Sequence, residues 1–248
     1  MKRSLKELMH CKVKAEDGPL GKIRDFLFDQ EAWMIRYIDA DFGNWFTADR
    51  VLIPVVFLDD FNEEDKCFPV RLSKEMIESG PHIEEHMTVS KEYESRLASH
   101  YDLQPYWPFT YSSPNSGAMY FPPRPLGVPA IDIEESNIET NLRSFREIEG
   151  YRVYARGKDI GSITDLYVDD QDCQIVYGLV DISNWFTPGK KVLMSIEGME
   201  QISYVEHAIN IPISPEKLDE APEFHKEGKI SEEHEKELYD YFSWGMVT

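Results

Sequence analysis

Residues 20–29 read Leu-Gly-Lys-Ile-Arg-Asp-Phe-Leu-Phe-Asp, and residues 160–169 return the same pattern as Ile-Gly-Ser-Ile-Thr-Asp-Leu-Tyr-Val-Asp. The glycine, the first isoleucine shared by both and the two aspartates stand 140 positions apart in the two copies. Asn-Trp-Phe-Thr at 44–47 recurs at 184–187 with the same offset, which becomes 141 after Thr187 and still relates Leu97 to Leu238. Solenoid repeats have periods of roughly 20–50 residues, so a repeat this long predicts two domains, each with its own core.

The length and composition agree with two small domains. The chain has 248 residues, and 42% of them are hydrophobic, which is enough for two modest cores. A formal net charge of −20 repels phosphate backbones and anionic lipid headgroups, so nucleic-acid binding and membrane-surface roles are disfavoured. The acidic balance is interpreted as a solvated surface, with a basic partner or bound cations as the alternatives.

Targeting signals and cysteine usage point to the cytoplasm. The N-terminal residues contain no apolar core of a secretory signal, and no stretch approaches the roughly 18 apolar residues that span a bilayer. We therefore expect a cytoplasmic protein without direct membrane insertion. Cys11, Cys67 and Cys173 do not recur at the repeat offset, which argues against a disulfide framework or a paired metal site. They are predicted to be reduced and mostly buried.

Each copy begins with signals for short strands. Apolar and polar positions mix in 20–29 and 160–169, while 34–41 and 174–181 are richer in Ile, Val and Tyr. Further strands are predicted near 51–54 and 67–72, and near 192–194 and 208–213. Gly-containing turns at 17–19 and 156–158 precede the first strand of each set. Several short strands at close spacing favour a small β-barrel in each copy.

Helix signals follow each barrel. Ser73, Ser90, Ser214 and Ser231 stand where helix N-caps are expected, and Pro215 is suited to a first helical turn. The second helix of each copy carries large side chains about four residues apart, which places them on one stripe. These are Tyr93, Leu97 and Tyr101 in the first copy and His234, Leu238 and Phe242 in the second. Each stripe is predicted to pack on a barrel.

The segment 106–141 between the copies has a different composition. It is rich in proline, which favours extended backbone, and also contains several aromatic residues. Exposing this many aromatic rings is unfavourable, so we expect a strap that packs along the barrels. A docking peptide for another protein is the alternative.

The strand at 20–29, the apolar strand that follows it, the Trp-containing loop and Val-Leu-Ile-Pro at 51–54 resemble the PRC-barrel, a domain named after the photosynthetic reaction centre H subunit. The second copy resembles it through 160–165 and 192–195. The resemblance implies a mainly β fold with some α: two small PRC-type barrels in tandem, each followed by short helices and joined by the strap. The expected boundaries are 1–105 and 142–248 for the barrels with their helices, and 106–141 for the linker. The family has no catalytic signature to transfer, so the resemblance specifies fold more than function.

Four residues within the repeated strand are assigned a structural role: Gly21, Asp25, Gly161 and Asp165. Asp25 and Asp165 interrupt otherwise suitable strands at the same place. A carboxylate at such a position could be a site, but it more often accepts hydrogen bonds from a neighbouring turn.

Two patterns resemble metal sites. Asp169, Asp170 and Asp172 form an acidic turn that could hold calcium, but no regular oxygen-ligand loop is present. His82 and His86 would share one face of a helix, as a zinc pair requires, but Glu223 and Glu227 stand at the matching positions of the second copy. We therefore predict no metal and no cofactor. Serine-histidine-aspartate groupings, phosphate-binding glycine loops and CxxC motifs are also absent, so no enzymatic activity is expected.

The Trp-Phe pairs are candidate interaction or barrel-packing residues. Trp45 and Phe46, like Trp185 and Phe186, lie between predicted strands. They could plug a barrel end, form an exposed contact patch or pack one barrel against the other.

These observations favour a non-enzymatic scaffold or adaptor of bacterial type with an unidentified protein partner. The alternatives are a peripheral subunit of a membrane electron-transfer complex and a ribosome-assembly factor. The strand at 174–181 is apolar on both faces, and a small barrel covers only one face from inside. The copies are therefore expected to pack as an internal pseudo-dimer, with homo-oligomerisation left open.

Overall fold

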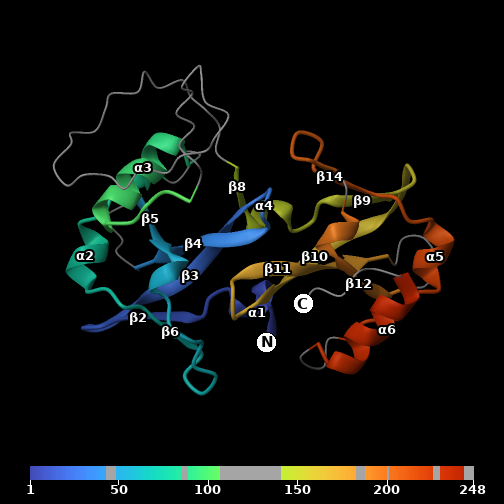
Figure 1. The fold of residues 1–248 in the computed structure, drawn as a ribbon, viewed down its shortest axis with the longest axis horizontal. Helices are drawn as coiled ribbons and strands as arrows, with labels where there is room; N and C mark the ends of the chain where they lie inside the picture. Colours follow the sequence, from blue (N-terminus) through green and yellow to red (C-terminus); the bar gives the residue numbers. More distant parts are fainter. Residues whose placement is uncertain are drawn as a thin grey trace, which may run out of the picture.

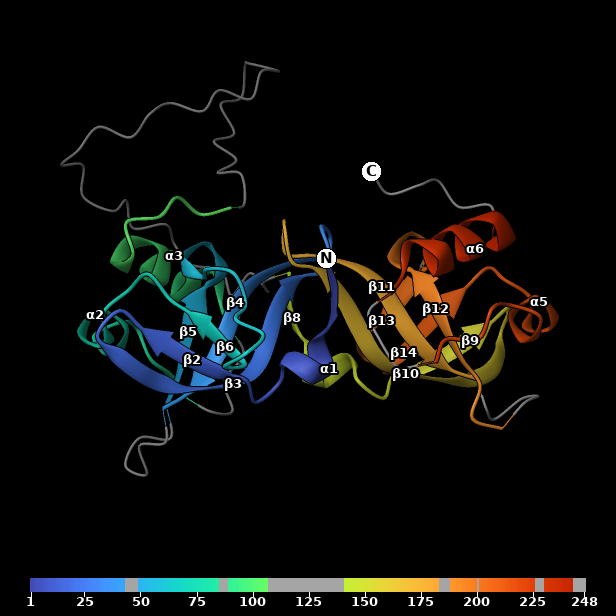
Figure 2. The ribbon, with the colours of Figure 1, turned by 90° about the horizontal axis from the view of Figure 1, so that it is seen from below.

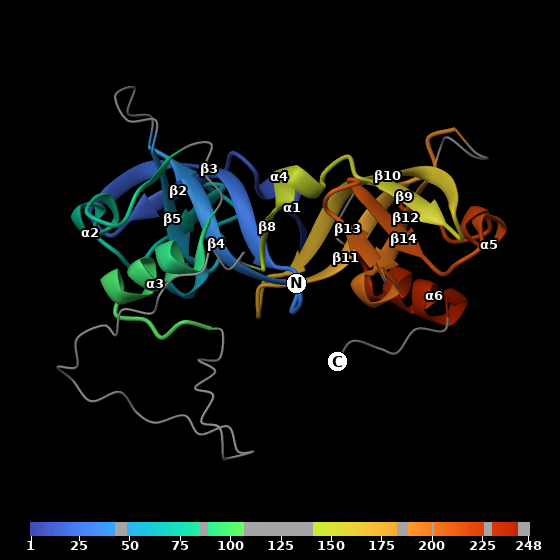
Figure 3. The same cartoon turned by 90° about the horizontal axis from the view of Figure 1, so that it is seen from above.

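The computed structural model describes residues 1–42, 49–84, 89–106, 141–182, 188–199, 201–225 and 230–242. They form two similar halves that lie side by side (Figure 1). The long helix of each half lies on one face of the molecule, and two one-turn helices lie at the centre of the opposite face (Figure 3).

The first half contains β1 (Lys2–Ser4), α1 (Leu5–Leu8), β2 (Lys12–Ala15), β3 (Gly18–Asp29), β4 (Met34–Asp41), β5 (Asp49–Pro54), the 3₁₀ turn η1 (Val55–Phe57), β6 (Cys67–Pro69), α2 (Lys74–Glu78), β7 (Ile83–Glu84) and α3 (Lys91–His100). The second half repeats this order with β8 (Leu142–Ser144), α4 (Phe145–Ile148), β9 (Arg152–Ala155), β10 (Lys158–Asp169), β11 (Gln174–Asp181), β12 (Lys191–Ser195), η2 (Ile196–Gly198), β13 (Gln201–Ser203), β14 (Ala208–Ile211), α5 (Pro215–Asp219) and α6 (Glu232–Phe242). The predicted fold class, mainly β with two barrels in tandem, is confirmed.

The strand connections are the same in both halves. Antiparallel pairs join β2 to β3, β3 to β4 and β4 to β5 in the first half. The matching antiparallel pairs of the second half join β9 to β10, β10 to β11 and β11 to β12. Parallel pairs join β2 to β6 and β9 to β14. One further pair, between β4 and β11, links the described strands into a single sheet that runs through both halves.

The glycines of the repeated strand are required by a close backbone approach. A Cβ atom on Gly21 would lie 2.0 Å from the carbonyl oxygen of Asp41, and one on Gly161 would lie 1.7 Å from that of Asp181. Both distances are far below van der Waals contact, so only glycine lets β3 and β10 approach the ends of β4 and β11 this closely.

The predicted helix caps are present. The side chains of Ser73, Ser90 and Ser214 each accept a hydrogen bond from a backbone N–H in the first turn of α2, α3 and α5. Ser231 does the same for His234 at the start of α6. Five of the six stripe residues are buried, with Leu97 at 0% and Leu238 at 1% exposure, and His234 is half-buried. Both helices therefore pack on their barrels.

The hydrophobic core is continuous between the halves. One cluster of buried side chains contains Ile23 and Ile38 from the first barrel and Ile163 and Leu179 from the second. Among the described residues, no helix is both long enough and apolar enough to cross a lipid bilayer.

Candidate functional site

Each copy supplies a strand and one helical turn to the other. Strand β1 pairs antiparallel with β10, and β8 pairs antiparallel with β3. The helical turns α1 and α4, which follow these strands, lie at the centre of the molecule (Figure 2). The exchange is reciprocal, which makes the two copies a pseudo-twofold pair. Expected boundaries at 105 and 142 did not anticipate that residues 2–4 join the sheet of the second copy.

The repeated aspartates hold the exchanged segments. Asp25 accepts hydrogen bonds from the Ser144 hydroxyl at 2.5 Å and from the backbone N–H of Arg146 at 3.2 Å. Asp165 accepts the matching bonds from the Ser4 hydroxyl at 2.5 Å and the N–H of Lys6 at 3.0 Å. Because Ser4 and Ser144 are also the N-caps of α1 and α4, each carboxylate fixes a helix start of the other copy.

A β-bulge gives these aspartates their orientation. The register of β3 on β4 shifts between Ile23 and Asp25, and that of β10 on β11 shifts between Ile163 and Asp165. Bulges re-aim side chains, and here they turn a carboxylate toward the sister copy. Burial raises the pKa of Asp25, an effect that its hydrogen bonds from Ser144, Arg146 and Phe26 partly offset.

The tips of the two central hairpins meet on the pseudo-twofold axis. The N–H of Ile35 donates to the Cys173 carbonyl at 2.9 Å, and the N–H of Ile175 donates to the Trp33 carbonyl at 2.7 Å. Trp33 and Cys173 occupy equivalent positions and share a left-handed backbone, with φ of 53° and 61°. The tip of the second hairpin lies against residues of the first barrel.

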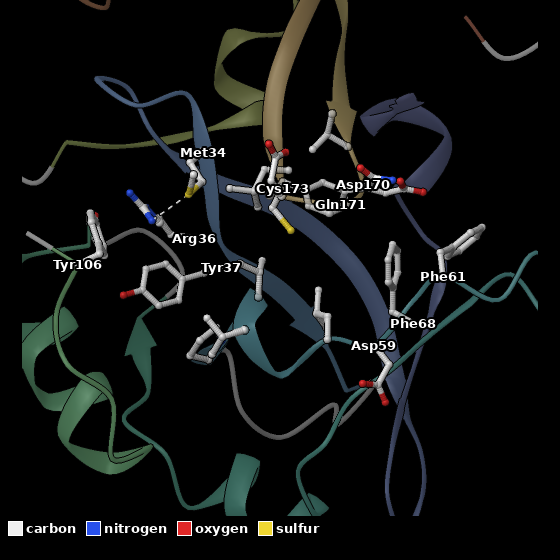
Figure 4. Close-up of a pocket in the computed structure, with 18 of the residues that line it drawn as sticks. Met34, Arg36, Tyr37, Asp59, Phe61, Phe68, Tyr106, Asp170, Gln171 and Cys173 are labelled. Atoms are coloured by element: carbon white, nitrogen blue, oxygen red, sulfur yellow. Dashed lines mark hydrogen bonds between the residues drawn. The ribbon is translucent and has the colours of Figure 1, made fainter. Parts of the chain in front are cut away.

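A cavity of about 810 Å³ lies where the tip of the second hairpin projects over the first barrel. We call it the inter-barrel groove, and its lining includes Met34, Tyr37, Phe61, Phe68, Tyr106 and Cys173. Figure 4 shows the Cys173 side chain pointing into the groove, with Tyr37 on one side of it and Phe68 on the other. The groove is thus built by both copies, and neither barrel forms it alone.

The groove has an apolar floor and an acidic rim. The rings of Phe61 and Phe68 pack at 4.8 Å between centroids, and the Arg3 guanidinium lies 5.1 Å from the Phe61 ring. Val56, at the same edge, is 55% exposed. Four lining carboxylates belong to Asp59, Asp60, Asp170 and Asp172. Apolar surface beside like-charged carboxylates is typical of a surface that receives a partner.

A buried carboxylic acid lies behind the groove. Glu94 on α3 is 1% exposed and accepts a hydrogen bond from the Tyr106 hydroxyl at 3.1 Å. Burial raises the pKa of Glu94 to about 7, although hydrogen bonds from Tyr106 and Tyr37 oppose this effect. The Arg36 guanidinium lies 4.1 Å from the Tyr106 ring and 3.5 Å from an Asp29 carboxylate oxygen. This cluster anchors residue 106 at the groove.

In the second copy, the equivalent glutamate forms an ion pair. Glu235 occupies the position of Glu94, accepts from the Tyr177 hydroxyl at 2.8 Å and lies 2.8 Å from the Lys2 amine. The residue equivalent to Lys2 is Leu142, on the exchanged strand β8 that joins the sheet of the first copy. The duplicated acid is therefore buried beside tyrosines in one copy and paired with lysine in the other.

The structure does not describe the Trp-Phe pairs or most of the predicted strap. Trp45, Phe46, Trp185 and Phe186 lie outside the described residues, as does the segment 107–140 that makes up nearly all of the predicted strap.

The two metal-like patterns do not form ligand sets among the described residues. The helix that would pair His82 with His86 is not formed, because Ile83–Glu84 is a strand that pairs with β5. His82 instead contacts the Glu78 carbonyl oxygen through Nε2 at 3.0 Å, and His86 lies outside the described residues. In the acidic turn, Asp170 pairs with Arg3 at 2.7 Å. Within the described ranges, no three His, Cys, Asp or Glu side chains are grouped as metal ligands.

The cysteines are free thiols with unequal exposure. Cys11 and Cys67 are buried, whereas Cys173 is only partly buried and lines the groove. Burial raises the pKa of the Cys173 thiol. Sequence reasoning missed the groove, although one signal was present: the hairpin tip carries Trp33 in the first copy and Cys173 in the second.

The comparisons with known proteins agree with this architecture. A family model for the PRC-barrel domain matches residues 2–77 and again residues 140–218, once in each half. The curated proteins compared with the chain gave no match. The two family matches begin at the exchanged strands β1 and β8 and cover more than half of the sequence, so this chain belongs to the PRC-barrel domain family, with two copies of the domain.

Proposed function

We propose that this protein is a non-enzymatic scaffold or adaptor that binds another protein through the inter-barrel groove. The observation that carries the proposal is that both copies build the groove, with Cys173 and Asp170 from the second and Phe61, Phe68 and Tyr37 from the first. A surface assembled by two fixed domains keeps its shape without a ligand, which lowers the ordering cost of binding.

The chemistry of the groove supports binding over catalysis. Its arginines are engaged: Arg3 pairs with Glu63 at 2.6 Å and Arg36 with Asp29 at 3.5 Å. The buried Glu94 carboxyl accepts a hydrogen bond from the Tyr106 hydroxyl, and burial raises the pKa of the Cys173 thiol. A raised pKa keeps a thiol protonated and weakly nucleophilic. This set provides recognition surface and no activated nucleophile with its base.

A cytoplasmic location accompanies the proposal, because the acidic surface repels anionic membranes. A peripheral role in a membrane electron-transfer complex and a role in ribosome assembly are the alternative outcomes of the test, since no contact among the described residues favours either.

The test is affinity capture from native lysate with the full chain as bait, followed by mass spectrometry. The matched control bait is an unrelated acidic protein of similar size and net charge, which removes partners held by charge alone. The expected result is one protein captured in stoichiometric amount by this chain and not by the control. Membrane-complex subunits or ribosomal proteins among the specific partners would favour one of the alternatives. The absence of any specific protein would contradict the adaptor role.

A further inference from the structure

The duplication supplies an internal reference for the groove. Cys173 and Val168 line the groove, and the pseudo-twofold places Trp33 and Phe28 at the equivalent location of the other copy. There the two rings stack, with centroids 5.2 Å apart and planes inclined by 14°. On the hairpin side, aromatic rings therefore occupy one of the two equivalent locations, and a valine and a cysteine occupy the other. The rings of the groove, Phe61 and Phe68, come from the barrel side, where the second copy has isoleucines.

A second position shows the same asymmetry. Arg3 and Arg143 are equivalent residues on the exchanged strands. The Arg143 guanidinium lies 4.1 Å from the Tyr204 ring, whereas Arg3 pairs with Glu63, which stands at the position of Tyr204. Three aromatic residues, Trp33, Phe28 and Tyr204, thus have non-aromatic equivalents. Cys173 and Val168 line the groove, and Glu63 pairs with the lining residue Arg3.

The charge of the rim defines the flanks of a ligand. Asp59 and Asp60 are both exposed on one side, and Asp170 and Asp172 lie on the hairpin tip at the other side. Arg3, Arg36 and Arg71 are paired with Glu63, Asp29 and Asp59. The amino group of Met1, which also lines the groove, pairs with Asp170 at 2.5 Å. Asp59 and Asp170 are therefore partly neutralised, which leaves Asp60 and Asp172 as the rim carboxylates available to a basic ligand. With a net charge of −20 on the whole chain, the field over the groove attracts cations.

The size of the groove defines the length of the ligand. A volume of about 810 Å³ falls within the roughly 300–1,000 Å³ typical of pockets that enclose a compact ligand. It has room for a few side chains of a peptide and not for the face of a folded domain.

We propose that the inter-barrel groove binds a short peptide segment of a partner protein, with an aromatic side chain that packs against Val168 and Cys173 and with Lys or Arg residues on either side. The aromatic ring takes the place that Trp33 and Phe28 fill in the sister copy, and the basic residues face the rim carboxylates. The inference rests on the proposed adaptor function and specifies its ligand.

The decisive variant is Cys173→Trp, which places the sister residue in the groove. Trp33 shows that tryptophan is accepted at this hairpin position with nearly the same left-handed backbone, φ 53° against 61°. The new ring is expected to occupy the place of the peptide's aromatic anchor. A thermal melt of the variant checks that the fold is retained.

The probe is a phage-displayed library of random twelve-residue peptides, panned against the full chain and, in parallel, against Cys173→Trp. The wild-type chain is expected to enrich peptides with Trp, Phe or Tyr beside Lys or Arg. Synthetic copies of the enriched peptides should bind Cys173→Trp at least about tenfold more weakly by fluorescence anisotropy, since buried aromatic anchors dominate such interfaces.

Charge variants test the rim. Asp59→Lys with Asp60→Lys should weaken binding at low salt, and the deficit should shrink as salt screens the rim. The matched control is Glu232→Lys with Glu233→Lys, which changes the net charge equally at two exposed residues of α6 in the second copy. The control should bind nearly as wild type does.

A measurement on the unaltered protein guards against misfolding of the variants. Bound peptide should slow alkylation of Cys173 by iodoacetamide, followed by mass spectrometry of the peptide that contains it. No enrichment from the library, enrichment of acidic peptides, or binding that survives Cys173→Trp without protection of Cys173 would each overturn the proposal. If the lysate partner is captured equally well by Cys173→Trp, the adaptor function stands and the groove assignment fails. If no partner is captured at all, the adaptor function itself fails.

Discussion

At the scale of single residues, the fold depends on two buried carboxylates. Asp25 is 5% exposed and Asp165 is 1% exposed, and each receives a hydroxyl and an N–H from a segment far away in the chain. Buried donors that lose their acceptor retain the full cost of desolvation. The aspartates therefore matter less for their charge than for the donors that they satisfy.

Removing one of these acceptors should be costly. Asp25→Ala leaves the Ser144 hydroxyl and the N–H groups of Arg146 and Phe26 without their carboxylate. We expect a loss of about 3 kcal/mol in the free energy of unfolding, measured by urea denaturation. Ser144→Ala removes one of these bonds and also the N-cap bond from the Glu147 N–H, and should cost about 2 kcal/mol. Equal losses for the two variants would show that the carboxylate has no role beyond its bond to Ser144.

Glu94 gives the protein a pH dependence of definite sign. Its pKa in the folded state is about 7, above the usual 4.5. Between these values the folded state binds more protons than the unfolded state, so stability is present below pH 4.5 and is lost as pH rises toward 7. The loss is on the order of 3 kcal/mol, and Asp29, Tyr37, Tyr106 and Lys91 are the ionisable groups that share its surroundings.

Glu94→Gln should abolish that loss, because a neutral amide still accepts from Tyr106. Urea denaturation of wild type and variant at pH 5 and pH 8 measures the difference. The control is Glu235→Gln, which removes the ion pair with Lys2 and leaves Glu94 in place. Glu235→Gln should therefore lose stability between pH 5 and pH 8 as the wild type does. A loss in Glu94→Gln as large as that of the wild type would contradict the assignment.

At the scale of elements, the close approach of β3 and β10 to the ends of β4 and β11 is the most demanding feature. Gly161→Ala would place a methyl group against the Asp181 carbonyl oxygen, with φ of 150° at this residue. Gly150 also has a positive φ, 95°, but no atom lies within 4 Å of a Cβ built there. Gly161→Ala should therefore destabilise by more than about 3 kcal/mol and Gly150→Ala by about 1 kcal/mol in thermal denaturation. Similar effects of the two variants would show that the close approach is unimportant.

The main strands, the turns and the helix caps could be predicted from the sequence because their residue patterns occur in both copies. The turns before Gly18 and Lys158 and the caps at Ser73 and Ser214 are local features, and local chemistry determines them. The exchange of β1 and β8 could not be predicted in this way. A three-residue strand pairs equally well with either of two duplicated edges, and only the geometry of the chain decides between them.

The groove was also beyond sequence reasoning, for a related reason. Its residues come from the N-terminal segment, β3, β4, 54–68, 98–106 and the second hairpin at 168–173, which no local pattern brings together. Aligning the two copies position by position gives one useful hint, because Trp33 of the first copy aligns with Cys173 of the second. The asymmetry of a duplicated protein indicates where its copies have diverged in role.

At the scale of the whole molecule, the reciprocal exchange makes two domains into one unit. Each sheet contains a strand from the other copy, and the core is continuous between them. Neither barrel is therefore complete without the other copy, and the packing of the two copies forms the groove.

The most direct test is native-state hydrogen exchange by mass spectrometry, along a series of urea concentrations, on the wild type and on Asp25→Ala. Peptides from β3–β4 and from β10–β11 should lose protection at the same urea concentration. Asp25→Ala should lower the opening free energy of both by the same amount, although the substitution lies in the first copy alone. Loss of protection confined to β3–β4, with β10–β11 unchanged, would contradict this coupling and would show two barrels that fold independently.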